Sequence, residues 1–245
     1  MINFNSNSLF STIPPVTRNI LIINFAVWLL CYLCGQMVNI LGLHYLCGQM
    51  ANILGLHYFQ SKGFYLYQFI TYMFTHESFS HLFFNMFALF MFGGVVERIW
   101  GPQRYLSYYL ITGIGAGLIQ MLVSYIQVRT YINRFEMDGL LSPSQLTYLY
   151  NSIPVTIGAS GAIFGLLLAF GMLFPNAPIY FMLIPIPIKA KYFVAGYGLI
   201  EFFFGISNRT GDNVAHFAHL GGMLFGIIMI LYWRKRGTNN GRNNF

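Results

Sequence analysis

Three polar sites interrupt apolar segments of this 245-residue chain, and each carries side chains that can take part in acyl transfer. The first is the pair His81 and Asn85, whose i, i+4 spacing places both side chains on one face of a helix. The second is Ser160, flanked by small residues, and the third is the pair His216 and His219. Polar groups inside an apolar span are candidates for function because burying them in lipid is unfavourable.

Ser160 and His219 together have the chemistry of nucleophilic catalysis. A serine hydroxyl is a weak nucleophile until a base takes its proton, and imidazole titrates close to neutral pH. His81, Asn85 and the backbone N–H of Ser160 can then donate to the oxyanion that forms on carbonyl attack. Each residue also has a plainer interpretation, because a serine among small residues usually serves helix packing and a membrane histidine usually bonds a neighbouring backbone.

Small residues allow the Ser160 and His219 segments to approach closely. The residues expected to pack the two helices together at this site are Gly158, Gly161, Phe164, Gly222 and Gly226. Phe164, one turn after the serine, is expected to pack on the imidazole. Neither Asp212 nor Glu201 is assigned as an acid that orients the histidine, since the first lies about two turns before it and the second is on another segment. The prediction is a Ser–His dyad that needs no metal and no cofactor.

The composition indicates that lipid is the solvent for the elements that position these residues. Hydrophobic residues make up 56% of the chain, charged residues 8%, and the mean hydropathy is +0.59. A soluble domain carries about 25% charged residues. The net charge of +7 sits mostly at the ends of apolar segments, which favours membrane lipid over nucleic acid as its partner.

Six apolar segments, each near the roughly 20 residues that span hydrocarbon, predict an all-α bundle of six transmembrane helices. They cover about 18–35, 80–100, 104–127, 157–174, 188–206 and 213–233. With both termini cytoplasmic, nine Lys and Arg residues lie inside and four outside, as the positive-inside rule favours. The second, fourth and sixth helices then run inward, so the polar groups lie within roughly 10 Å of the outer boundary.

Four other stretches are set apart by their composition or by repetition. Residues 1–17 form a polar N-terminal segment that precedes the domain at 18–233, and 234–245 form a basic tail that we expect to be disordered. Within 33–58, a 13-residue sequence is repeated in tandem, which we interpret as a lengthened first outer loop. Four prolines between 175 and 187 prevent a helix from continuing there.

These motifs resemble those of the rhomboid family of intramembrane proteases. The GASGAIFG sequence at 158–165 is similar to the family's GxSG nucleophile motif, and H-x-x-x-N at 81–85 to its oxyanion motif. Gly93, Glu97 and Gly101 follow its G-x-x-x-E-x-x-x-G pattern. AHLGGMLFG at 218–226 resembles A-H-x-x-G-x-x-x-G, and that register selects His219 over His216 as the base. The chain departs from the family at Tyr67-Gln68, in place of Trp-Arg, and at Phe164, where some members carry Tyr.

The resemblance implies a six-helix core with a water-filled cavity open to the outer face. It also implies cofactor-free hydrolysis of transmembrane protein substrates. The expected location is the bacterial cytoplasmic (inner) membrane. Two alternatives are an inactive relative that only binds its partners and a channel or transporter lined by the same polar groups. The channel is disfavoured because the inner halves of the second, fourth and sixth segments are almost wholly apolar.

Overall fold

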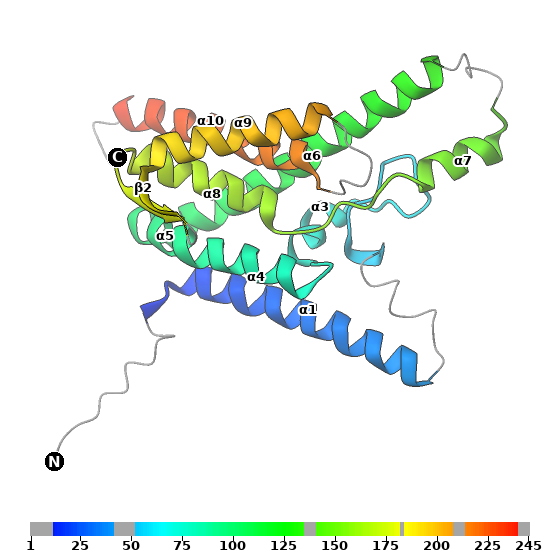
Figure 1. The fold of residues 1–245 in the computed structure, drawn as a ribbon, viewed down its shortest axis with the longest axis horizontal. Helices are drawn as coiled ribbons and strands as arrows, with labels where there is room; N and C mark the ends of the chain where they lie inside the picture. Colours follow the sequence, from blue (N-terminus) through cyan, green and yellow to red (C-terminus); the bar gives the residue numbers. More distant parts are fainter. Residues whose placement is uncertain (1–11, 42–51, 135–140, 182–183, 208–213, 240–245) are drawn as a thin grey trace.

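The computed structural model describes residues 12–41, 52–134, 141–181, 184–207 and 214–239, which form a helical bundle with one short β-hairpin (Figure 1). The elements are α1 (Pro15–Leu41), α3 (Gln68–Thr71), η2 (Tyr72–Phe74), α4 (Phe79–Ala88), η3 (Leu89–Gly93), α5 (Gly94–Trp100), α6 (Pro102–Arg134), α7 (Pro143–Asn151), α8 (Ser160–Leu173), β1 (Pro178–Phe181), β2 (Ile184–Lys189), α9 (Ala190–Ser207) and α10 (His216–Asn239). In Figure 1, α1 and α4 lie along one side of the bundle, and α9 and α10 lie along the other.

Several helices have the length and composition of membrane spans. Four described stretches are long and apolar enough to cross a membrane: Pro15–Cys34, Phe79–Trp100, Pro102–Arg134 and His216–Gly237. The second of these joins α4, η3 and α5 without a break, η3 being a π-helical turn. Helix α8, with 14 residues, and α9, with 18, are not among the four. The count of six spans and the side on which each terminus lies stay predictions.

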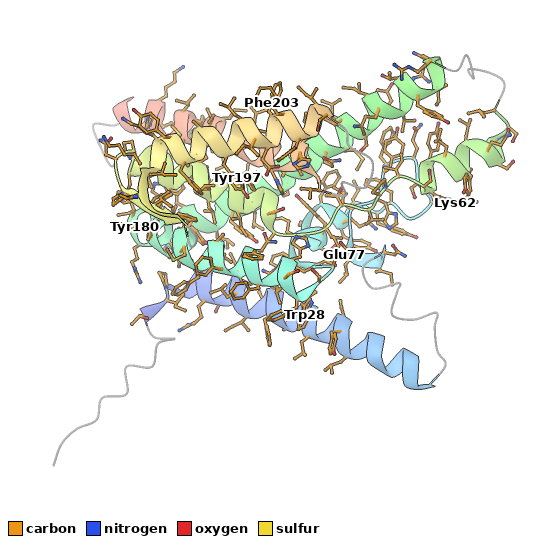
Figure 2. The ribbon with its side chains drawn as sticks, in the orientation of Figure 1. Trp28, Lys62, Glu77, Tyr180, Tyr197 and Phe203 are labelled. Atoms are coloured by element: carbon orange, nitrogen blue, oxygen red, sulfur yellow. The ribbon has the colours of Figure 1, made fainter. Side chains whose placement is uncertain are left out.

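The outer surface of the bundle is apolar over most of its helices. Phe203 on α9 is 66% exposed, and Phe84 on α4 is 61% exposed. Phe203, labelled in Figure 2, lies on the side of α9 that faces away from the other helices. A water-soluble monomer rarely exposes apolar patches on this scale, so these faces suit contact with lipid tails.

Helix α8 lies at the centre of the bundle, packed against α6 and α10, and most of its side chains are buried. Small residues make this packing possible. A Cβ on Gly165 of α8 would lie 2.8 Å from the Thr112 side chain of α6. The Tyr108 hydroxyl of α6 donates to the Gly165 carbonyl oxygen at 2.8 Å, which satisfies a buried donor within the membrane.

Two family-motif residues, Glu97 and Gly101, fix how α5 meets α1 and α6. The buried Glu97 carboxylate accepts from the Val16 N–H at 2.9 Å and from the Thr17 N–H and hydroxyl, both at 2.7 Å. It therefore caps the N-terminus of α1, where helix N–H groups lack partners. Gly101 adopts a φ of 78°, which turns the chain sharply into α6.

Gln68 occupies one of the two positions at which the sequence departs from the family. Its fully buried amide accepts from the His57 and Tyr65 N–H groups at 3.2 Å each. It donates to the carbonyls of Ile53 at 3.2 Å and Gly63 at 2.8 Å. Gln68 thus cross-links the loop that precedes α3.

The structure corrects two sequence expectations about element boundaries and adds a hairpin to a third that it confirms. Helix α1 continues to Leu41, past the predicted end at 35, so part of the first repeat copy is helical. Helix α10 continues to Asn239, so the expected disorder is wrong for 234–239, where Lys and Arg favour the end of a helix. The predicted helix break at 175–187 is confirmed, but β1 and β2 pair there as an antiparallel hairpin that the sequence analysis did not expect.

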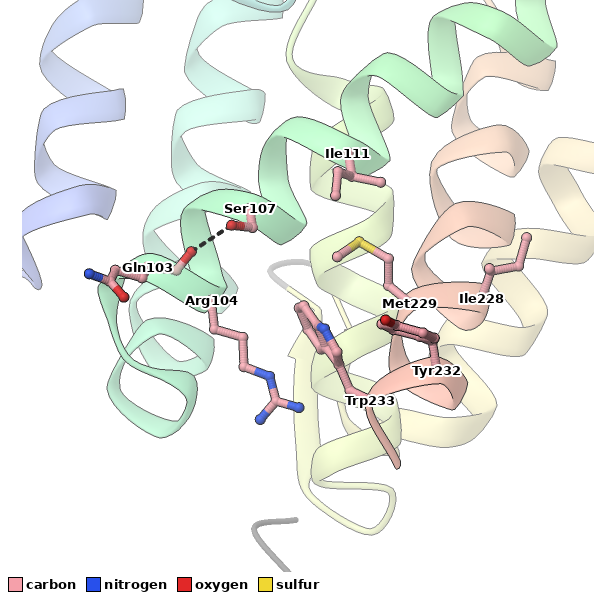
Figure 3. Close-up of a pocket in the computed structure, with 8 residues that line it drawn as sticks. All are labelled: Gln103, Arg104, Ser107, Ile111, Ile228, Met229, Tyr232 and Trp233. Atoms are coloured by element: carbon pink, nitrogen blue, oxygen red, sulfur yellow. Dashed lines mark hydrogen bonds between the residues drawn. The ribbon is translucent and has the colours of Figure 1, made fainter. Parts of the chain in front are cut away.

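A groove of about 580 Å³ lies between α6 and α10 (Figure 3). It is lined by Gln103, Arg104, Ser107, Ile111, Ile228, Met229, Tyr232 and Trp233. The Arg104 guanidinium lies 4.3 Å from the centroid of the Trp233 ring. None of the residues predicted to carry chemistry lines this groove, so the candidate site is elsewhere.

Candidate active site

The segment before α8 is held by main-chain hydrogen bonds to distant parts of the chain. Thr156 and Leu56 exchange two N–H···O bonds of 2.9 Å, and the Gly158 N–H donates to the Tyr72 carbonyl at 2.9 Å. These bonds set the point at which α8 begins, which is Ser160 itself. The Ser160 N–H therefore lies in the first turn of a helix, where backbone donors lack intrahelical partners.

Glycine is required at position 158 for two reasons, its backbone conformation and the closeness of the His81 ring. Its φ of 118° is one that L side chains rarely adopt. A Cβ there would lie 2.7 Å from His81 Nε2 and 3.7 Å from Ser160 Oγ. The imidazole of His81 therefore lies against the backbone just before the serine.

Ser160 and His219 form a hydrogen-bonded pair across two helices. The distance between Ser160 Oγ and His219 Nε2 is 2.8 Å, so the predicted reach between hydroxyl and imidazole is confirmed. Gly222, one turn after His219, makes this approach possible, because a Cβ there would clash with the Gly161 carbonyl oxygen. Only helices without side chains at the crossing can come this close.

Phe164 packs face to face on the histidine, as the sequence analysis expected. Its ring centroid lies 4.2 Å from that of His219, with an interplanar angle of 5°. On its other side Phe164 stacks on Tyr197 of α9, at 5.0 Å and 24°. Gly226, the last of the predicted packing residues, lies one turn further along α10, where a Cβ would meet the Tyr108 hydroxyl.

Asn85 lies one turn after His81 on α4 and is buried. Its Nδ2 donates to the His81 carbonyl oxygen at 2.8 Å, which leaves the second amide hydrogen for another acceptor. The structure thus places the His81 ring beside the serine and Asn85 on the same helix, one turn further along the chain. Their role as oxyanion donors stays a prediction.

Glu201 of α9 is the residue that the sequence analysis left unassigned and the structure brings into the site. Its Oε2 atom lies 2.8 Å from Nδ1 of His219 and 2.6 Å from Nδ1 of His216. The only sequence signal was a single acidic residue in an otherwise apolar segment. Asp212, the other acid considered, lies outside the described residues.

His76, in the loop before α4, is a second residue near the candidate site that the sequence analysis missed. The Ala159 N–H points to its Nε2 at 3.5 Å, and its ring meets the His81 ring edge-on at a centroid distance of 4.9 Å. Burial, and after it the nearby His81, lower the pKa of His76 to about 3. The ring is therefore neutral at physiological pH and can accept the Ala159 bond.

Glu201, His216 and His219 are also the one group of three possible metal ligands among the residues that the structure describes. Their ligand atoms lie within 4.8 Å of one another, and two imidazoles with a carboxylate are donor types that zinc accepts. The same three atoms are joined by the two short hydrogen bonds to Glu201. Hydrogen bonding alone therefore accounts for their arrangement.

Comparison with known proteins places this helical membrane chain in a family. The family model "Rhomboid domain" matches residues 63–236, so the chain belongs to the rhomboid family. It is 29% identical over 168 residues to Rhomboid protein 1, mitochondrial, of Saccharomyces cerevisiae, covering 66% of this chain and 40% of that protein. It is 29% identical over 172 residues to Rhomboid-like protein 11, chloroplastic, of Arabidopsis thaliana, covering 67% and 51%.

A third relative is named as a protease. The chain is 30% identical over 171 residues to Rhomboid protease AarA of Providencia stuartii, covering 65% of this chain and 53% of that protein. The chain thus spans about two fifths to half the length of these relatives. Because the names of the first two place them in organelles, these comparisons give no support to the expected bacterial inner membrane.

Proposed function

We propose that this chain is an intramembrane serine endopeptidase that hydrolyses peptide bonds in or near the transmembrane helices of other membrane proteins. The observation that carries the proposal is the 2.8 Å contact between Ser160 Oγ and His219 Nε2, made by two apolar helices at the centre of the bundle. Polar groups inside apolar helices are unfavourable to bury, and such a pair is a candidate for function by default.

In the proposed reaction, Ser160 Oγ attacks the carbonyl carbon of the scissile bond while its proton passes to His219 Nε2. The oxyanion that forms accepts hydrogen bonds from the Ser160 N–H, His81 and Asn85. His219 then gives its proton to the leaving amine, and the C–N bond breaks. Water, deprotonated by the same imidazole, hydrolyses the acyl-enzyme and restores the serine.

The length of α8 supports a site below the membrane surface. Its 14 residues extend about 21 Å, which is less than the roughly 30 Å of a hydrocarbon core. A helix that starts at Ser160 and runs inward therefore begins below one boundary, in keeping with the predicted depth of the polar groups. The six-span topology with cytoplasmic termini and an outward-facing site is part of this proposal.

The test is cleavage of a labelled single-span membrane protein by the purified chain in detergent and in liposomes. The expected result is cleavage by the unmodified protein and none by Ser160→Ala or His219→Ala. Cleavage that survives either substitution would refute the dyad. Cleavage that is lost in His216→Ala but retained in His219→Ala would show that His216, and not His219, is the base. A folded protein that cleaves no substrate would favour the inactive relative.

A further inference from the structure

Glu201 is an acidic residue in a helix that is otherwise apolar where it packs. Only Ala190, Val194 and Glu201 are buried on α9, and Glu201 is 5% exposed. A buried carboxylate in a membrane span is unfavourable unless it is hydrogen-bonded or paired. Its partners here are two imidazoles of α10 rather than backbone donors or a basic side chain.

The direction of these hydrogen bonds decides which nitrogen of His219 can act as a base. An ionised carboxylate only accepts, so Nδ1 of each histidine must carry a hydrogen. In a neutral imidazole the other nitrogen, Nε2, then has the free lone pair. In His219 that nitrogen is the one 2.8 Å from Ser160 Oγ, which is the tautomer that general-base catalysis needs.

Phe164 and Glu201 restrain the imidazole of His219 in complementary ways. Stacking at an interplanar angle of 5° fixes the plane of the ring, but a ring can still turn within that plane. The 2.8 Å bond from Nδ1 to Glu201 fixes the remaining angle. Together the two contacts define both the plane of the imidazole and the direction in which Nε2 points.

We propose that Glu201 is a positioning residue for the reaction and that His216 holds its carboxylate in place. Ser160, His219 and Glu201 then form one hydrogen-bonded series, called the relay below, in which the proton moves between Ser160 and His219 and Glu201 stays ionised. This rests on the proposed function. When the Ser160 proton reaches His219, the imidazolium lies 2.8 Å from the Glu201 carboxylate. Charge attraction over that distance in a water-poor site stabilises the ion that forms during the reaction.

The titratable groups that face His219 from the surrounding helices are few. Among the residues that the structure describes, they are Glu201 of α9, His216 of its own helix and His81 of α4. Tyr197 of α9 stacks on Phe164, which in turn stacks on His219. Glu201 is the acid of this described set. Replacing it by Gln removes the negative charge from the site with almost no change in shape.

The experiment compares Glu201→Gln with the unmodified protein in kcat, KM and the pH dependence of kcat/KM for a labelled transmembrane substrate. We expect kcat to fall about 10- to 100-fold while KM changes less than about 2-fold, because the carboxylate does not touch the substrate. We also expect the acidic limb of the profile to move to lower pH, since the imidazolium loses its negative neighbour. His216→Phe should lower kcat by a smaller factor, about 2- to 10-fold.

Glu97→Gln is the matched control, because it changes another buried glutamate, whose carboxylate accepts its hydrogen bonds at the start of α1. It should lower the unfolding temperature and leave kcat and the pH profile of the folded protein unchanged. If Glu201→Gln fails to fold, Glu201→Asp keeps the charge and should keep the acidic limb in place with a reduced kcat.

The relay is overturned if Glu201→Gln matches the unmodified protein in kcat and pH profile, or loses stability without moving the acidic limb. A Glu201→Asp profile displaced as far as that of Glu201→Gln also overturns it. Ser160→Ala, run in parallel, separates the two proposals. Residual cleavage by Ser160→Ala defeats the proposed function, whereas a dead Ser160→Ala beside a fully active Glu201→Gln defeats only the relay.

Discussion

Two buried glutamates, Glu97 and Glu201, show how differently one side chain is used in two regions of this membrane bundle. Glu97 is 2% exposed and Glu201 is 5% exposed, so burial does not distinguish them. Glu97 accepts from backbone and hydroxyl donors at the start of α1, whereas Glu201 accepts from two imidazoles, one of which contacts Ser160.

The difference lies in the partners and in what they can do. Backbone N–H groups at a helix start keep their protons at all physiological pH values, so the Glu97 region is an anchor. An imidazole can accept and return a proton within a reaction, so the Glu201 region can change its charge during catalysis. In a membrane span, therefore, the partners of a buried acid indicate function better than its depth does.

The largest expected effect is that of replacing the nucleophile or the base that Glu201 positions. Ser160→Ala and His219→Ala should each lower cleavage of a transmembrane substrate by at least about 10⁴-fold, since nucleophile and base act as one unit. The double variant should be no worse than either single one. Losses that multiply in the double variant would show that the two residues act separately.

Disturbing the helix packing at the site should have the next largest effect. Gly222→Ala places a Cβ against the Gly161 backbone, so we expect a loss of about 1 to 3 kcal/mol in the free energy of unfolding and at least about a 10-fold loss of activity. Gly196→Ala on α9 is the matched control, because a Cβ there meets nothing within 4 Å. Equal behaviour of the two variants in denaturation and cleavage assays would contradict the close helix crossing.

A substitution at Glu97, in the anchor region, should change the stability of the protein and leave its activity unchanged. Glu97→Gln keeps the shape of the side chain but replaces one acceptor oxygen by an NH2 group, which cannot accept a hydrogen bond. At least one of the three donors then loses its acceptor, which should lower the free energy of unfolding by about 1 to 3 kcal/mol. Thermal unfolding in detergent measures this, and the cleavage rate per folded molecule should be unchanged. A selective loss of turnover without destabilisation would place Glu97 in the reaction.

The smallest expected effect is that of metal removal. If the group of Glu201, His216 and His219 works through hydrogen bonds, dialysis against EDTA should change the cleavage rate by less than about 2-fold. The measurement is cleavage before and after chelation, with added Zn²⁺ as the comparison. Loss of activity on chelation that Zn²⁺ restores would replace the relay by a metal centre.

The sequence predicts the core of the candidate site because its parts are local. Ser160 and its small neighbours, and His219 with Gly222 one turn on, are each contained in a few residues of one helix. Helical periodicity then gives the faces that can meet. The hydroxyl–imidazole contact and the stacking of Phe164 agree with that pattern.

Glu201 and the hairpin could not be predicted in the same way. The contact of Glu201 with His219 depends on how α9 rotates and slides against α10, which no spacing within either segment encodes. The hairpin of β1 and β2 contains the prolines that rule out a helix. Proline does not indicate, however, which two segments pair as strands. The end of α10 was misplaced because polar residues continue this helix beyond its apolar part. The end of α1 was misplaced because the start of the repeat, interpreted as a loop, continues the helix to Leu41.

The most direct test of the account is to find which residue a serine-directed fluorophosphonate probe modifies. In that reaction Ser160 Oγ bonds to phosphorus, fluoride leaves, and the hydroxyl proton passes to His219. Peptide mass mapping of the protein in detergent should find the adduct on Ser160, and His219→Ala should abolish it. An adduct on another residue, or labelling of Ser160 at an equal rate in His219→Ala, would contradict the central claim.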